Sequence, residues 1–111
     1  MFITFPKHWS MVDCVNNLQR RVLLNSILYY ERDKTALNDA QFKLLCEQLI
    51  DYTSKCSNVG DSEFWYVFHD FDISTTFDLY HRLTDDDKTK LNRMVDLYER
   101  RTAERDKYRK H

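Results

Sequence analysis

The sequence predicts an all-α protein, a small bundle of four or five helices forming a single domain over residues 1–111. The first observation is the presence of only one Gly and one Pro, because sandwiches and barrels need many turns built from these residues. The second is the repeat of apolar residues at spacings of three and four, which is the helical period. Apolar residues make up 42% and charged residues 32% of the chain, a globular composition rather than a disordered one.

The first predicted helix spans residues 11–32, with Ser10 as its N-cap. Its apolar stripe contains Met11, Val15, Leu18 and Val22, and it is widened by Leu23, Ile27 and Leu28. A stripe this wide indicates a helix that packs on two sides. Residues 2–5 precede it and read FITF, so they form either an apolar arm or one short N-terminal strand.

The second predicted helix spans residues 39–56 and follows a polar loop at residues 33–38. One clean face carries its apolar residues, namely Phe42, Leu45, Leu49, Tyr52 and Cys56. This spacing alternates between three and four, as expected for an amphipathic helix packed on one side. Together the two helices predict a hairpin over residues 11–56.

An aromatic and acidic segment covers residues 61–84. It contains the apolar run FWYVF at residues 64–68, which periodicity alone assigns to neither a buried strand nor a short buried helix. The absence of an obvious partner strand favours the helix. Thr76 or Ser74 is expected to cap a further turn of helix that ends at Leu83.

The last predicted helix spans residues 85–108, with Thr84 as its N-cap. Three aspartates occupy its first turn, where carboxylates favour the positive end of the helix dipole. Its apolar stripe consists of Leu91, Met94, Val95 and Tyr98. Beyond Tyr98 the stripe thins out, so residues 99–111 are expected to project as a solvated helix or to fray, and a homodimer through paired helices is left open.

The cysteines and histidines give no sign of a metal site or a disulfide framework. Cys14, Cys46 and Cys56 form no CxxC pair, and the first two read as small buried residues. His8, His69, His81 and His111 have no zinc-binding spacing. The opening MFITFPKHW does not have the pattern of a signal peptide, and no apolar run reaches membrane-spanning length. We therefore expect a cytoplasmic location, no membrane contact and no metal.

Five positions around the first loop carry a family resemblance. Tyr29 and Tyr30 end the first helix, and Asp39, Phe42 and Lys43 begin the second. Over residues 15–55 this arrangement resembles the N-terminal helical subdomain of NAD-dependent DNA ligases, which binds the nicotinamide half of NAD. The resemblance implies a nucleotide site for NAD or nicotinamide mononucleotide at these five residues.

The chain departs from the ligase pattern in ways that affect the chemistry. Phe42 stands where the family has a tyrosine, and Lys43 where it has an aspartate. A lysine charge near a cationic nicotinamide ring is repulsive. The family's catalytic lysine lies in a separate, larger domain that has no counterpart in this sequence. We therefore expect no adenylation, no nick sealing and no enzyme activity. The segment HDFDISTTFDLYHRL, within residues 64–83, resembles small proteins of bacterial viruses, which implies a viral origin.

Asp70 and Asp72 invite two further interpretations. Asp-x-Asp after a strand is typical of haloacid-dehalogenase-type phosphatases, but the alternating strands and helices of that fold are missing. A calcium loop starting at Asp70 lacks its turn glycine, since Thr75 holds that position, and its final glutamate, since His81 holds that one. The plainer interpretation is that Asp70 and Asp72 cap a helix or pair with an arginine such as Arg20 or Arg21.

The charge distribution predicts two different interaction surfaces. Residues 61–87 hold eight acids and one arginine, and residues 99–111 hold six basic and three acidic residues. The leading hypothesis is a non-enzymatic interaction protein of a bacterial virus that binds and inhibits a host enzyme or defence protein. Its partner-binding residues would be Asp70, Asp72, Asp78, Asp85, Asp86 and Asp87. A further alternative is nucleic-acid binding through Arg100, Arg101, Arg105, Lys107, Arg109 and Lys110.

Most of the aromatic cluster is expected to be core, with a partner anchor as the alternative role for one or two of its members. The cluster consists of Phe64, Trp65, Tyr66, Phe68, Phe71 and Phe77.

Overall fold

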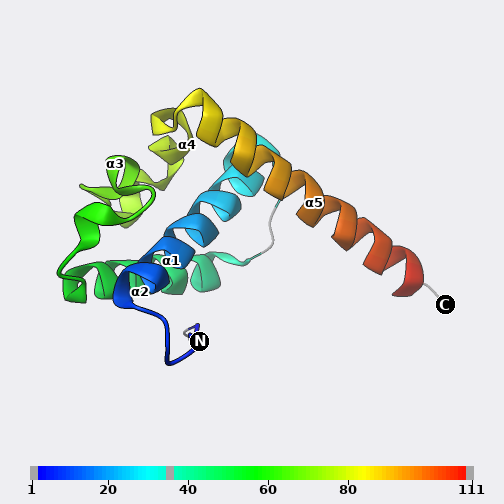
Figure 1. The fold of residues 1–111 in the computed structure, drawn as a ribbon. Coiled ribbons are helices and arrows are strands. Elements are labelled where there is room, and N and C mark those ends of the chain that lie inside the picture. The colour runs from blue at the N-terminus through cyan, green and yellow to red at the C-terminus, as the bar shows by residue number, and fades with distance from the viewer. Residues whose placement is uncertain (1–2, 35–36, 110–111) are drawn as a thin grey trace.

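The described part of the protein is a small all-α bundle, which confirms the predicted fold class (Figure 1). A computed structural model describes residues 3–34 and 37–109, with side chains up to residue 105. The described part contains the α-helices α1 (Met11–Ser26), α2 (Asp39–Lys55), α3 (Trp65–Phe68), α4 (Leu79–Arg82) and α5 (Asp85–Arg109). It also contains the π-helix η1 (Ile27–Glu31) and the 3-10 helices η2 (Val59–Asp61) and η3 (Ile73–Asp78), and these residues form no strand.

The long helices begin where their capping residues are. The Ser10 hydroxyl accepts a hydrogen bond from the Asp13 backbone N–H, and the Asp13 carboxylate accepts one from Ser10 in return. Asn38 caps α2 in the same reciprocal way with Gln41. The Thr84 hydroxyl accepts from the backbone N–H of Asp87 at the start of α5. The predicted caps at Ser10 and Thr84 are confirmed, and each satisfies a backbone donor that the helix leaves unpaired.

The first predicted helix changes its geometry before it ends. After Ser26 the chain continues as the π-helix η1, and the Arg32 N–H donates to the Ile27 carbonyl. Asp33 then adopts a left-handed conformation with φ 51°, which aspartate tolerates better than most residues. This residue ends the helix and turns the chain toward α2.

The aromatic segment is helical, as favoured for residues 64–68, but one predicted cap is wrong. Asp72, rather than Thr76 or Ser74, starts the next helical stretch, because its carboxylate accepts from the Ser74 N–H at 3.0 Å. Thr76 is buried within η3. A short aspartate side chain competes well with threonine for a helix N-terminus.

The core lies around α1, which is in contact with α2, α4 and α5. The fully buried side chains come from every part of the fold and include Leu18, Val22, Leu23, Ile27, Leu49, Phe64, Val67, Leu79 and Leu91. Helix α1 therefore packs on more than one side, as its wide stripe predicts. Helix α5 crosses the body near its start, and its C-terminal part projects beyond it (Figure 1).

Residues 3–5 form an arm and not a strand, and Phe2, which the prediction also covers, lies outside the described residues. The anchor of this arm is Gln48, a side chain that is buried in α2. The Gln48 amide accepts from the Ile3 N–H at 2.9 Å and donates to the Ile3 carbonyl at 2.6 Å. Phe5 then stacks on Trp9 and lies edge-on to Tyr52. One side chain thus satisfies the backbone groups that a partner strand would otherwise pair.

Candidate functional site

A pocket of about 210 Å³ lies beside the π-helix, and all five residues of the predicted nucleotide site line it. They are Tyr29, Tyr30, Asp39, Phe42 and Lys43. The tyrosines come from η1, and the other three come from the first two turns of α2. The structure thus brings together two groups of residues that the sequence separates by a loop.

The tyrosine pair forms an angular aromatic wall. The two rings meet edge to face, with 4.8 Å between centroids and 82° between planes. Tyr29 is 51% and Tyr30 44% exposed, so both rings offer surface to a ligand. The Tyr30 hydroxyl lies 3.1 Å from the Thr76 hydroxyl, and this hydrogen bond holds its ring in place. Exposed rings held in one position bind aromatic groups at low entropic cost.

The α2 side of the pocket supplies one ring and two opposite charges. Phe42 is half-buried, whereas Asp39 and Lys43 are exposed. The Lys43 ammonium lies 4.0 Å from the Glu47 carboxylate one turn further along the helix. Such an exposed pair is weak, so the lysine charge remains available to a ligand.

Four other lining residues were not predicted to belong to this site. Asn25, Leu37, Ile73 and Thr76 complete the pocket. Thr76 is 46 residues from its partner Tyr30, and no local pattern pairs positions that far apart. The sequence marked Thr76 only as a candidate helix cap within the aromatic and acidic segment 61–84.

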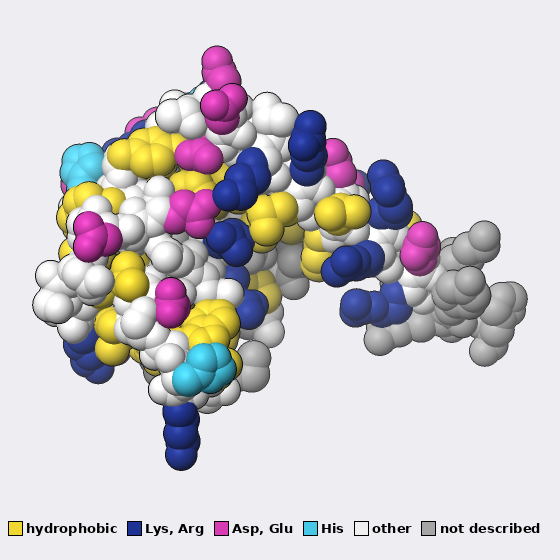
Figure 2. Space-filling model, viewed as in Figure 1, with side chains coloured by type: hydrophobic (Ala, Val, Ile, Leu, Met, Phe, Trp, Pro, Cys, Tyr) yellow, Lys and Arg dark blue, Asp and Glu magenta, His cyan; other side chains and the backbone are white. Residues whose placement is uncertain are grey.

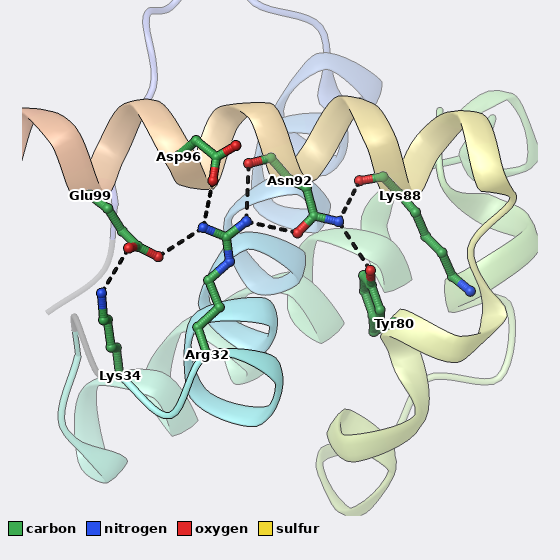
Figure 3. Close-up of polar contacts among 7 residues, drawn as sticks. All are labelled: Arg32, Lys34, Tyr80, Lys88, Asn92, Asp96 and Glu99. Atoms are coloured by element: carbon green, nitrogen blue, oxygen red, sulfur yellow. Dashed lines mark hydrogen bonds and ion pairs between the residues drawn. The ribbon is translucent and has the colours of Figure 1, made fainter.

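An ion-pair network next to the pocket ties η1 to α5 (Figure 3). Arg32 follows directly after η1 and donates hydrogen bonds to Asp96 at 2.7 Å, Glu99 at 2.9 Å and the Asn92 side chain at 2.9 Å. Lys34 reaches Glu99 at 2.8 Å. Burial alone would lower the pKa of Arg32, but the hydrogen bonds to Asp96 and Glu99 raise it. The end of the π-helix is therefore fixed by contacts with a distant helix.

Most of the predicted partner-binding aspartates have partners within the chain. Arg82 bridges Asp70 at 2.6 Å and Asp78 at 3.1 Å. The hydrogen bond from Arg82 holds the pKa of the Asp70 carboxyl below its ordinary value. Asp72 caps η3. The plainer interpretation is thus confirmed for both aspartates, although the pairing arginine is Arg82.

The expected alternatives Arg20 and Arg21 have other partners. Arg20 pairs with Glu63, and Arg21 donates to Asn17.

The aspartates at the start of α5 differ in their surroundings. The Asp87 carboxylate accepts a hydrogen bond from the Tyr66 hydroxyl. Burial and this hydrogen bond raise the pKa of Tyr66. Asp85 and Asp86 are exposed, and no ion pair joins them to another described residue. Tyr66 and Phe77 are the exposed members of the aromatic cluster, at 41% and 59%.

Basic side chains predominate along the projecting part of α5, whereas acidic ones are scattered over the body (Figure 2). Arg100, Arg101 and Arg105 are exposed on this helix. Lys107 and Arg109 belong to α5, but their side chains lie outside the described residues, as does all of Lys110.

The cysteines are buried, and no metal-binding cluster occurs among the described residues. Cys14, Cys46 and Cys56 are at most 6% exposed. Burial raises the pKa of the Cys46 thiol to about 12. Over residues 3–34 and 37–109, no three His, Cys, Asp or Glu side chains gather as metal ligands would. His111 lies outside the described residues.

None of the helices in the described part of the chain combines the length and apolar character needed to cross a membrane. No known protein family matches this sequence, and no curated protein or solved structure is significantly similar to it.

Proposed function

We propose that this chain is a non-catalytic nucleotide-binding protein with its site in the pocket between η1 and α2. The observation that carries the proposal is that Tyr29, Tyr30, Asp39, Phe42 and Lys43 all line one pocket. The ring of the ligand would lie against Phe42 and the tyrosine pair, within reach of the Lys43 charge, and its phosphate would lie at the exposed rim. The ligands tested first are NAD and nicotinamide mononucleotide.

The size of the pocket limits how much of a nucleotide it holds. Its volume of about 210 Å³ is below the range of roughly 300–1,000 Å³ that is usual for drug-sized ligands. It suits one planar ring, with the ribose and phosphate at the exposed rim. A ligand held by a single ring buries little area, so we expect modest affinity.

The direct test is an NMR titration of the labelled protein with each nucleotide. Saturable shifts confined to the amides of Tyr29, Tyr30, Asp39 and Phe42 would support the proposal. The Phe42→Ala variant should lose them. Phe77→Ala is the matched control, because Phe77 is an exposed aromatic next to Thr76 but does not line the pocket. Flat spectra at millimolar ligand would count decisively against nucleotide binding.

A second candidate is an interaction protein of a bacterial virus that inhibits a host enzyme or defence protein. It is supported by the exposure of Asp85 and Asp86 at the start of α5 and of Tyr66 and Phe77 nearby in the sequence. Exposed aromatic rings are common anchors in interfaces, and exposed charges favour a partner of opposite charge.

This candidate is tested by capturing partners from bacterial lysate with the wild-type chain and with an Asp85→Lys/Asp86→Lys variant. A saturable partner that the variant loses would support it. Equal capture by both chains would exclude these aspartates as the binding surface.

A third candidate, nucleic-acid binding, is supported by the arginines on the projecting part of α5. Truncation after Tyr98 is a poor test, since it removes Glu99, which holds Arg32 and Lys34. Replacing Arg100, Arg101 and Arg105 with Gln keeps that network. Binding that depends on salt and falls in this variant would support the candidate. Unchanged binding would contradict it.

A further inference from the structure

A second cavity, larger than the nucleotide pocket, lies between α1, α2 and α5. Its volume is about 410 Å³, which is within the usual range for small-molecule sites. Its lining residues are Ile3, Arg21, Leu24, Asn25, Leu28, Leu37, Gln41, Leu44, Leu45, Gln48, Val95 and Tyr98. Only Asn25 and Leu37 also line the first pocket, so the two spaces are neighbours with different walls.

The walls of this cavity are aliphatic. Seven of the lining residues are Leu, Ile or Val. The buried Gln48 adds no free polar group, because its amide both accepts from and donates to the Ile3 backbone. An apolar chain placed there would gain roughly 0.8 kcal/mol for each CH₂ group removed from water.

The polar side chains at the rim favour an anion. Arg21 is exposed, and within the described part of the chain its guanidinium has one hydrogen-bond partner, because Nε donates to Asn17 at 2.6 Å. The Gln41 amide oxygen already accepts from the Asn38 N–H, which leaves its NH₂ group to donate. No carboxylate occurs among the lining residues that the structure describes. The rim thus offers a positive charge and a donor beside an apolar interior.

We propose that this cavity binds a long-chain carboxylate, with the hydrocarbon tail against Leu24, Leu28 and Leu44 and the carboxylate at Arg21. A guanidinium matches a carboxylate in charge and in its two-donor geometry. A neutral apolar ligand would make no ionic contact with Arg21, and the Arg21 charge would repel a cationic ligand. The inference concerns a different site from the nucleotide pocket and does not depend on it.

The test uses a fluorescent fatty acid, cis-parinaric acid, whose emission rises in apolar surroundings. We expect saturable binding that dodecanoic acid displaces. Dodecanol, which has the same chain without the charge, should displace the probe about fivefold less well, in line with one exposed charged contact. The Arg21→Gln variant should erase the difference between acid and alcohol while leaving the fold intact, since Arg21 is exposed.

Further variants test whether the probe binds in this cavity or in the nucleotide pocket. Leu44→Trp places a large ring into the cavity and should weaken probe binding at least about tenfold, with circular dichroism to verify folding. Phe42→Ala alters only the other pocket and should leave probe binding unchanged. The proposal is overturned if acid and alcohol displace the probe equally from wild-type protein. It is also overturned if the folded Leu44→Trp variant binds the probe as tightly as the wild type. Binding of the probe to a Phe2→Ala variant but not to the wild type would overturn it as well, because the occupant of the cavity would then be the chain's own N-terminal segment.

Discussion

Arg32 and Glu99 lie 2.9 Å apart and join the end of the π-helix to α5 across 67 residues of sequence. The Arg32 side chain is 23% exposed and that of Glu99 is 24% exposed. Partial burial makes this contact stronger than an ordinary surface ion pair, because water screens it less. Arg32 also bonds Asp96 and Asn92, so one side chain holds three residues of α5.

Removing Arg32 should destabilise the protein more than removing Lys34. We expect Arg32→Ala to lower the free energy of unfolding by about 1–2 kcal/mol, because it removes a partly buried side chain that donates hydrogen bonds to three residues of α5. Lys34→Ala removes one exposed contact to the same Glu99 and should cost under about 0.5 kcal/mol. Urea unfolding of both variants measures the difference. Equal losses of unfolding free energy in the two variants would mean that the Arg32 network stabilises the protein no more than an exposed ion pair does.

Stability should fall in acid as the paired carboxylates gain protons. The hydrogen bond from Arg82 lowers the pKa of Asp70. Burial raises the pKa of Glu63, but hydrogen bonds from Lys90 and Arg20 outweigh it and lower the pKa overall. A carboxyl whose pKa is lower in the folded state stabilises the fold at every pH above its unfolded-state pKa of about 4. This stabilisation is lost as the pH falls through the lower, folded-state pKa. We therefore expect flat stability from these groups between about pH 5 and 7 and a decline below about pH 4.

Urea midpoints measured from pH 7 to pH 2 test this prediction. In the Arg82→Met variant the decline should be shallower, since Asp70 no longer titrates at a lowered pKa. A wild-type midpoint that stays constant down to pH 2 would contradict the prediction.

The cysteines should react only when the chain unfolds. All three are nearly inaccessible, and burial raises the pKa of Cys46 to about 12. The thiolate is the reactive form, so a thiol reagent at pH 8 should label native protein very slowly and urea-unfolded protein fully. Mass spectrometry should find Cys46 labelled last. Rapid labelling of native protein at Cys46 would show that the core opens near α2.

Replacing the buried Gln19 should be costly. Its amide donates to the Ser62 hydroxyl at 3.0 Å and accepts from the Phe64 N–H at 3.1 Å. Gln19→Leu has a similar size but leaves the buried Phe64 N–H unpaired, for which we expect a loss of about 1–3 kcal/mol. Thr89→Ala on the exposed side of α5 is the control and should change stability by under about 0.5 kcal/mol. Similar thermal midpoints for both variants would mean that a water molecule accepts the Phe64 N–H hydrogen bond in place of Gln19.

The charge at position 43 should decide which form of a nicotinamide nucleotide binds better. Lys43 lines the pocket and repels a cationic ring. Lys43→Asp should therefore strengthen binding of oxidised nicotinamide mononucleotide by roughly fivefold and leave the reduced, uncharged ring little changed. The affinity of the Lys43→Gln variant for the oxidised nucleotide should lie between the affinities of the wild type and Lys43→Asp. Titration calorimetry gives the affinities, and an unchanged preference would place the ring away from Lys43.

Local patterns predicted the long elements of this fold well. The stripe of residues 39–56 corresponds to α2, and the caps at Ser10 and Thr84 are where the sequence puts them. These features depend on neighbours three or four residues away, which a single sequence displays. The π-helix was not predicted, because one extra residue in a turn leaves almost no trace in the apolar spacing.

The site was predicted only in part for the same reason. The tyrosine pair, Asp39 and Phe42 are near enough in sequence for a resemblance to connect them. Thr76, the Arg32 network and the cavity at Leu44 depend on packing between elements 46 or more residues apart or on three helices at once. Periodicity contains no information on which helix faces which, so a single sequence does not display these contacts.

The π-helix also sets the direction in which Tyr29, Tyr30 and Arg32 point relative to α1. An α-helix turns by about 100° per residue, and η1 accommodates one residue more than an α-helical turn does. Deleting a single residue within Ile27–Glu31 would let α1 continue as an uninterrupted α-helix. The tyrosine pair and Arg32 would then rotate to another side, away from Asp39 and α5. The extra residue in this turn thus directs the tyrosine pair to the pocket and Arg32 to α5 at the same time. We expect the number of residues in the π-helix to tolerate change less than their identity.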